Sequence, residues 1–175
     1  MAVNAFISFF DKADGESVQK GKEKWIEIQG WDWEVEAETS WTKGGGASVG
    51  KPNPGKMNWE HYFDKSSCTL LQYICSGAAF DTVELRMFKG TGQAVQTGPN
   101  TQFFTMLMKG AFITKVTNSA TEEGNVLQKV EMVFKEVTIK YRPQEDPPKG
   151  SKSSGAGQLG SEISYNWDIP GGKVT

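Results

Sequence analysis

Imidazole and thiol groups, which serve many catalytic and metal sites, are few in this chain of 175 residues: one histidine, His61, and two cysteines, Cys68 and Cys75. A Ser–His–acid or Cys–His site would have to include His61, and a metal centre rich in imidazole or thiolate has too few ligands. His61 stands among large side chains in the run WEHYFD, which is typical of a structural residue on a strand or at its end. We therefore expect no catalytic residue, no cofactor, no metal and no enzyme activity.

The two cysteines are expected to be buried, reduced thiols on one helix. Seven residues along a helix place them about 10.5 Å apart, which is too far for a disulfide bond. Buried reduced thiols suit a reducing compartment.

Two glycine-rich motifs match nucleotide-binding patterns but stand in the wrong context. Gly45–Lys51 has the spacing of a phosphate loop, yet Pro52 replaces the serine or threonine that would hold magnesium, and the PNPG that follows cannot begin a helix. Gly155–Gly160 fits the dinucleotide fingerprint literally, but it leads into a strand and not into a helix. We expect neither segment to bind a nucleotide.

Composition excludes two further classes of partner. The formal net charge is −2 and Arg86 and Arg142 are the only arginines, so neither nucleic acid nor an anionic membrane surface is an expected partner. No apolar run approaches the roughly 20 residues that a membrane helix needs. The opening MAVNAFISFF lacks a basic region and a small-residue cleavage site, so no signal peptide is expected.

One helix is predicted, from Asp64 to Gly77. Asp64, Ser66 or Ser67 can cap its start by accepting hydrogen bonds from free N–H groups, and Gly77 suits its left-handed end. The apolar residues recur at helical spacing and are expected to face a sheet: Cys68, Leu71, Ile74 and Cys75.

The other apolar residues alternate with a period of two, which indicates half-buried strands. The strand at 102–116 is expected to bulge at Gly110, and the segment 126–141 changes phase near Lys135–Glu136, which predicts a bend from one sheet into another. Further strands are expected at 3–9, 25–29, 31–38, 162–169 and on both sides of the helix. Seven or eight strands and one helix predict a single, mainly β domain over 1–175: a β-barrel of two packed antiparallel sheets with one flanking α-helix.

Two features point to a surface that serves assembly. Four acids share one face of the 31–38 strand, as a solvated surface, an interface or the wall of a wet channel: Asp32, Glu34, Glu36 and Glu38. The glycine- and proline-rich segments 43–56 and 143–160 are predicted to be an extended loop and a flexible loop, and long loops in compact domains are often functional. Unpaired strand edges together with such a loop suit a subunit of a larger assembly.

Several short motifs follow one another in a recognisable order. They are FIS at 6–8 followed by GES at 15–17, WDW at 31–33, GGG at 44–46, YFDKSS at 62–67, VTIKYRP at 137–143 and YNWD at 165–168. In this order and spacing, over residues 2 to 169, the chain resembles the Hcp (haemolysin-coregulated protein) family of type VI secretion tube proteins.

The resemblance implies β-barrel subunits that form hexameric rings, which stack into a tube. A contractile sheath expels this tube with a VgrG-like spike at its tip, and effector proteins can be carried or chaperoned in the lumen. The protein would be cytoplasmic and then secreted through the type VI apparatus without a signal peptide.

The resemblance also implies roles for particular residues. Those that would contact an adjacent ring or subunit are Lys43, Gly44, Gly45, Gly46, Val49, Lys51 and Lys56. The acidic face at 32–38 would line the lumen or would contact lysines of a neighbouring subunit, namely Lys129, Lys135 and Lys140.

Two other functions stay open from the sequence. A tail-tube protein of a phage-like contractile particle would have the same architecture. A monomeric carbohydrate-binding β-sandwich would instead present exposed tryptophans to a sugar. Trp31, Trp33 and Trp167 occur at strand period, however, which is more typical of core or interface residues.

Overall fold

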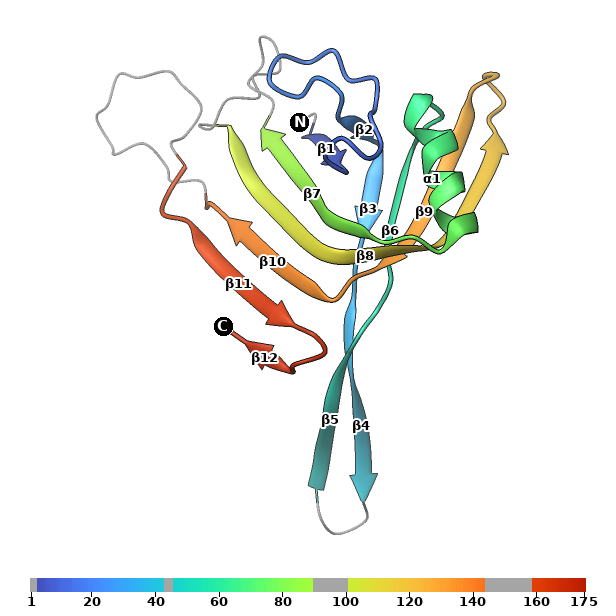
Figure 1. Ribbon diagram of the computed structural model, residues 1–175. Helices are drawn as coiled ribbons and strands as arrows, with labels where there is room; N and C mark the ends of the chain where they lie inside the picture. The colour runs from blue at the N-terminus through green and yellow to red at the C-terminus, as the bar shows by residue number, and fades with distance from the viewer. Residues whose placement is uncertain (1–2, 43–45, 90–100, 144–158) are drawn as a thin grey trace, which may run out of the picture.

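The computed structural model describes residues 3–42, 46–89, 101–143 and 159–175, which contain twelve strands and one helix (Figure 1). The predicted mainly β class with a single flanking helix is confirmed. The segment 143–160, predicted as a flexible loop, lies almost wholly outside the described residues. The elements are β1 Val3–Ser8, β2 Ile26–Ile28, β3 Gly30–Asp32, β4 Val35–Thr42, β5 Gly46–Pro54, β6 Met57–Tyr62, α1 Lys65–Ser76, β7 Phe80–Lys89, β8 Gln102–Ala120, β9 Val126–Val133, β10 Glu136–Tyr141, β11 Ile163–Asp168 and β12 Lys173–Val174.

Ten strands form one curved antiparallel sheet, and β4 and β5 form a separate sheet of two strands. The large sheet runs in the order β12-β11-β10-β8-β7-β1-β2, and a branch leads from β8 through β9 and β6 to β3 (Figure 1). Pairing ends at β2, so the predicted barrel does not close. The N–H of Gln29, just after β2, donates to the carbonyl of Glu60 on β6 at 2.8 Å and holds the two open ends together.

The long strand β8 joins the two halves of this sheet. Its first half pairs with β7 and β10, and from Phe112 onward it pairs with β9. Gly110 has φ +61°, which bends the strand at this transition, and a side chain there would also press against Lys135. The predicted bulge was placed too early, since the register shift lies between Ile113 and Lys115.

The predicted bend in 126–141 is confirmed. The segment divides into β9, which pairs with β6 and β8, and β10, which pairs with β8 and β11. Phe134 and Lys135 separate the two strands. The change of phase in the sequence therefore marks the point where the chain passes from one half of the sheet to the other.

The helix has the predicted bounds and caps. The carboxylate of Asp64 accepts a hydrogen bond from the N–H of Ser66 at 2.9 Å, and Asp64 donates its own N–H to Ser67 Oγ at 3.0 Å. Gly77 ends the helix with φ +68°. Within the described residues, no helix is long and apolar enough to cross a membrane.

The predicted buried face of α1 is wrong in part: Ile74 packs against the core as expected, but the two cysteines do not. Ser66, Ser67 and Leu70 are buried, whereas Cys68 and Cys75 are exposed free thiols. The ring of Tyr73 stacks on Phe80 of β7 with centroids 4.0 Å apart. Packing of Leu70 and Tyr73 buries more apolar surface than two thiols would, so these residues set the rotation of the helix.

Trp31, Trp33 and Trp167 belong to the core or its margin, as their period predicted. Trp31 stacks on Phe104 with centroids 5.3 Å apart, and Trp33 packs against Phe134 and Trp167. Trp167 is buried, and Trp31 and Trp33 are partly buried against the core. These three side chains do not form an exposed platform for a sugar.

A smaller cluster covers the outer face of β1 and β7. Phe6 and Phe88 meet edge to face, and the ammonium of Lys22 lies 4.1 Å from the centre of the Trp25 ring. Burial and the neighbouring Arg86 lower the pKa of Lys22 to about 8. The loop that precedes β2 is therefore held to the sheet by packing over aromatic rings.

Candidate assembly surfaces

The segment predicted as an extended loop is mostly a strand. β5 pairs antiparallel with β4, from Val35 opposite Pro54 to Thr42 opposite Gly46, and the hairpin projects away from the large sheet (Figure 1). The prediction of an extended loop over 43–56 is wrong for residues 46–54, because a strand whose residues are almost all exposed has no apolar alternation to reveal it. A strand at 46–54 also removes the turn and helix that a phosphate loop would require.

The predicted contact residues fall into three groups. Gly46, Val49 and Lys51 lie on exposed parts of β5, and Val49 is 70% exposed. Lys43, Gly44 and Gly45 lie outside the described residues. The Nζ of Lys56, beyond the end of β5, lies 3.0 Å from a carboxylate oxygen of Glu131 on β9, so Lys56 belongs to the base of the hairpin.

The predicted single strand over 31–38 is wrong. The chain leaves the large sheet after β3 and begins the hairpin at β4. Between them, the Nε1–H of Trp33 donates to the carbonyl of Gly55 at 3.2 Å, while its ring packs against Phe134. Trp33 therefore fixes the junction between the hairpin and the body.

The four acids are consequently divided between two sheets, although all are exposed. The carboxylate of Asp32 on β3 accepts a hydrogen bond from Asn58 Nδ2 at 2.8 Å, and Glu34 lies at the junction. Glu36 and Glu38 belong to the projecting strand β4. Two of the predicted residues thus stay with the body, and two leave it with the hairpin.

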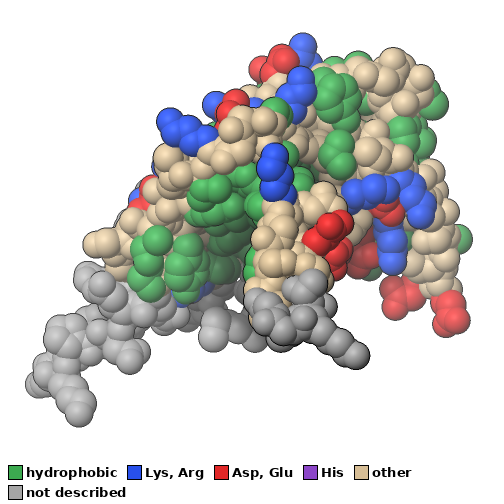
Figure 2. Space-filling model, turned by 90° about the horizontal axis from the view of Figure 1, so that it is seen from below, with side chains coloured by type: hydrophobic (Ala, Val, Ile, Leu, Met, Phe, Trp, Pro, Cys, Tyr) green, Lys and Arg blue, Asp and Glu red, His purple; other side chains and the backbone are tan. Residues whose placement is uncertain are grey.

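The lysines proposed as partners of these acids are partly engaged within their own chain. Lys129 lies 3.4 Å from Glu60, and Lys140 lies 3.0 Å from Glu162. The lower face shows acidic and basic side chains next to one another, beside a hollow lined by hydrophobic groups (Figure 2). Exposed pairs of this kind are worth about 0–1 kcal/mol, so they do not prevent exchange of partners in an assembly.

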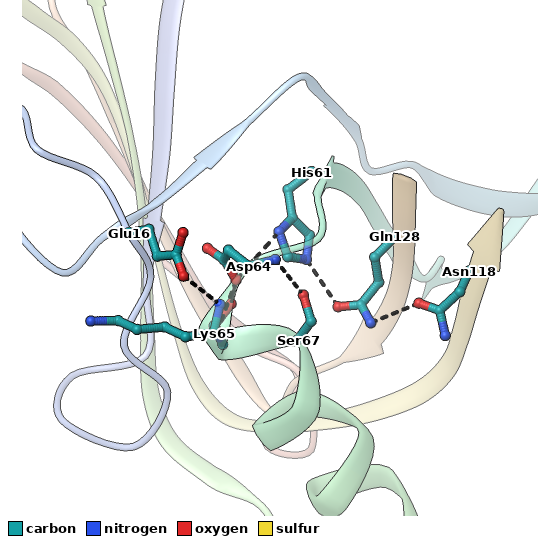
Figure 3. Close-up of polar contacts among 8 residues, drawn as sticks. Glu16, His61, Asp64, Lys65, Ser67, Asn118 and Gln128 are labelled. Carbon is teal, nitrogen blue, oxygen red and sulfur yellow. Dashed lines mark hydrogen bonds and ion pairs between the residues drawn. The ribbon is translucent and has the colours of Figure 1, made fainter. Parts of the chain in front are cut away.

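His61 lies in a buried polar cluster at the start of α1 (Figure 3). Its Nε2 lies 2.9 Å from Gln128 Oε1, and Gln128 Nε2 donates to Asn118 Oδ1 at 2.8 Å. Since the amide of Gln128 is oriented by Asn118, its oxygen faces the ring and Nε2 carries the proton. Nδ1 lies 3.9 Å from the carboxylate of Asp64 and has no hydrogen bond.

This arrangement supports the structural interpretation of His61. The hydrogen bond from the ring to Gln128 and the bond from Gln128 to Asn118 together join β6, β9 and β8, and the nearby Asp64 already caps the helix. Burial lowers the pKa of His61, against smaller opposing effects of Gln128 and of the Asp64 charge. Across the described ranges, no three His, Cys, Asp or Glu side chains gather as metal ligands would.

We expect this histidine to make the fold sensitive to acid. The folded state keeps His61 neutral, while the unfolded chain binds its proton near pH 6.5. The unfolded chain therefore holds more protons below that pH, and stability should fall as the pH drops from about 7 to 5. Urea unfolding at several pH values measures the free energy of unfolding at each pH. We expect this free energy to change less with pH in His61→Gln than in the wild type, and an equal dependence on pH would contradict the prediction.

Residues 6–141 of the chain match the family described as "Type VI secretion system effector, Hcp". The chain belongs to the Hcp family. Protein hcp1 of Pseudomonas aeruginosa is 28% identical over 170 residues, which cover 97% of this chain and 96% of that protein. Hcp membership makes the chain a tube component of a type VI secretion system and a secreted structural protein. The phage-particle and sugar-binding alternatives are not favoured.

Solved structures share the Hcp fold at lower identity. A type six secretion system protein superimposes with a TM-score of 0.81 at 24% identity, covering 99% of this chain and all of that one. Hcp1 from Salmonella typhimurium gives a TM-score of 0.72 at 21% identity, with 100% of both chains covered. The curved sheet and flanking helix are therefore the shared architecture.

Proposed function

We propose that the chain, as one domain over residues 1–175, forms hexameric rings that stack into an expelled tube through the β4–β5 hairpin. The observation that carries this proposal is the hairpin itself, whose strands pair only with each other within the described part of the chain (Figure 1). An isolated two-stranded ribbon is marginally stable in water. Contact with another subunit or ring would cover its exposed edges and stabilise it.

The residues on the hairpin take the contact role in this proposal. Val49 and Lys51 of β5 meet the adjacent ring, and Glu36 and Glu38 of β4 meet a neighbouring subunit and do not line the lumen. These two acids leave the body with the hairpin, which favours the interface over the channel wall. Asp32, which is hydrogen-bonded to Asn58, and Glu34, whose carbonyl accepts from the N–H of Gly55, stay at the base and support the hairpin.

The remaining partners follow from the tube role. The stacked rings would lie inside a contractile sheath and carry a VgrG-like spike, and effector proteins would occupy the lumen. The protein would assemble in the cytoplasm and leave through the type VI apparatus without a signal peptide.

A shortened hairpin tests the proposal. Glu36 and Asn53 lie opposite each other in the ribbon, so residues 37–52 can be replaced by the two-residue turn Asn-Gly. We expect the wild type to form rings with about six times the subunit mass of 19.3 kDa and to stack at high concentration. The shortened protein should form single rings. Light scattering measures the mass, and negative-stain images count stacked rings.

Ring formation and stacking through the hairpin can be contradicted independently of each other. A wild-type protein that stays monomeric at every concentration would contradict the ring. Stacks of normal length from the shortened protein would contradict the role of the hairpin. Circular dichroism melts of both proteins show whether the shortened chain keeps its fold.

A further inference from the structure

The loop between β1 and β2 buries a lysine ammonium against aromatic rings. Lys22 is only 4% exposed, and its Nζ lies 4.1 Å from the centre of the Trp25 ring and 5.3 Å from that of Phe88. Among the described residues, it forms no ion pair and its ammonium donates no hydrogen bond. Lysine is almost never buried so deeply unless it is paired. An ammonium with three N–H donors and ring faces as neighbours is suited to an anion.

The carboxylates close to Lys22 are bonded to other groups. Glu84 and Glu23 both favour the charged form of Lys22. However, Glu84 Oε1 accepts a hydrogen bond from the Nε of Arg86 at 2.7 Å, and the carboxylate of Glu23 accepts one from the N–H of Gly21 at 2.9 Å. Glu84 therefore neutralises Arg86, and the charge of Lys22 has no counter-ion of its own.

A second donor without a partner lies on the same face of the sheet. Asn4 of β1 is opposite Phe88 of β7, and residues opposite each other in an antiparallel pair point to the same face. The Nδ2 of Asn4 is buried and has no hydrogen-bond partner. A buried amide in this state is unfavourable. Lys22 and Asn4 thus both hold N–H donors beside Phe88.

Arg86 forms the side of this cluster that faces solvent. It is opposite Phe6 in the register of β1 and β7, so it shares the face of Asn4. Its guanidinium lies 5.2 Å from the centre of the Trp25 ring, and its side chain is 30% exposed. A small ligand can therefore approach Lys22 along Arg86.

We propose that Lys22, Asn4 and Arg86 form a binding site for a small carboxylate anion, independent of the proposed ring stacking. One oxygen of the carboxylate would accept from Lys22 Nζ and the other from Asn4 Nδ2, while Arg86 adds a second positive charge. One negative charge matches the one cation that lacks a counter-ion, which favours a monocarboxylate over a phosphate. The neighbouring ring of Trp25 favours an organic acid, whose apolar part can contact it.

An NMR titration of the Lys22 side chain tests the site. Burial and Arg86 lower the pKa of Lys22 to about 8, against the opposing charges of Glu84 and Glu23, and a bound carboxylate would favour the ammonium. We expect saturating sodium acetate to raise the proton affinity of Lys22 about tenfold over sodium chloride at the same ionic strength. The signal that Lys22→Arg removes identifies the residue. An equal rise in sodium chloride would show charge screening only and would overturn the site.

The same linkage predicts how acetate binding depends on pH. Because acetate should bind the charged form of Lys22, its dissociation constant should rise about tenfold between pH 7 and pH 10, as the ammonium loses its proton. A dissociation constant that stays the same over this range would overturn the role of Lys22.

Two variants and a control locate the binding site. Lys22→Gln should weaken acetate binding at pH 7 by at least about tenfold, and Asn4→Ala by about fivefold. Asn4→Ala removes a buried amide without a partner, so it should keep its fold, which circular dichroism melts check. Lys24→Gln is the matched control, because Lys24 is exposed and pairs with Asp14, and it should bind acetate like the wild type. Equal binding by all four proteins would overturn the site.

A dilution series distinguishes a free acid from a carboxylate that another copy supplies. Without acetate, the pKa of Lys22 should stay lowered at every protein concentration. A pKa in the ordinary range of lysine that falls on dilution would overturn the free acid as the ligand, because a second copy would then provide the carboxylate. Failure of acetate to bind would overturn this inference and leave the proposed function intact, since ring formation does not depend on it.

Discussion

Phe80→Ala is expected to lower the free energy of unfolding by about 3–5 kcal/mol. Phe80 is 1% exposed, and its ring lies between Tyr73 of α1 and Phe9, with centroids 4.0 and 4.5 Å away. Truncation would open a cavity at the contact that attaches the helix to the sheet. The surrounding rings are wide and rigid, so they cannot close this space without losing their own contacts.

Urea unfolding followed by tryptophan fluorescence measures this loss. Phe63→Ala is the matched control, because Phe63 is 42% exposed and its truncation should cost less than about 1 kcal/mol. Equal losses for the two variants would contradict the central place of Phe80 in the core.

Gly15→Ala is expected to destabilise the fold by about 2–4 kcal/mol. A Cβ at this position would lie 2.3 Å from the backbone carbonyl oxygen of Trp25 and 2.6 Å from the nitrogen of Ile26. Backbone atoms cannot rotate away as a side chain could. The chain would have to separate, which would stretch the hydrogen bonds from Gly15 to Lys24 and from Ser17 to Trp25.

Gly30→Ala gives the comparison for this prediction. A Cβ at Gly30 would have its nearest neighbour, a side-chain oxygen of Glu60, at 4.0 Å, so the change should stay within about 1 kcal/mol. Amide exchange at Ser17 should accelerate in the Gly15 variant and stay unchanged in the Gly30 variant. Unchanged exchange and stability in both would show that the close approach to Trp25 does not constrain the fold.

The sequence predicts best those elements that have one buried face and recognisable ends. The caps of α1 could be placed because Asp64 and Gly77 act through local backbone geometry. The bend between β9 and β10 could be placed because passing between halves of the sheet reverses which side chains point inward. Both signals are contained within a few residues.

Other features depend on contacts that no local pattern contains. The rotation of α1 is decided by the stacking of Tyr73 on Phe80, so the cysteines at helical spacing turn outward. The division of 31–38 depends on Trp33, which bonds to Gly55 across 22 positions of the sequence. The strand β5 shows no apolar alternation in the sequence, because almost all of its residues are exposed.

The cluster around Lys22 lay beyond sequence reasoning for a related reason. Its side chains come from three places in the chain, and only the arrangement of β1, β7 and the loop before β2 gathers them. The burial of Lys22 is equally a property of the folded molecule. A lone lysine or asparagine in the sequence gives no sign of such a site.

The continuity of β8 also decides how the molecule comes apart. Its 19 residues are hydrogen-bonded to β7 and β10 in one half and to β9 in the other. Neither half of the sheet can unfold without breaking its hydrogen bonds to β8. The large sheet should therefore unfold cooperatively. Among the described strands, none beyond the base of the hairpin pairs with β4 or β5 from outside, so the hairpin can fray alone. The large sheet would then resist heat and mechanical force, while the hairpin could change its conformation to fit a neighbouring subunit.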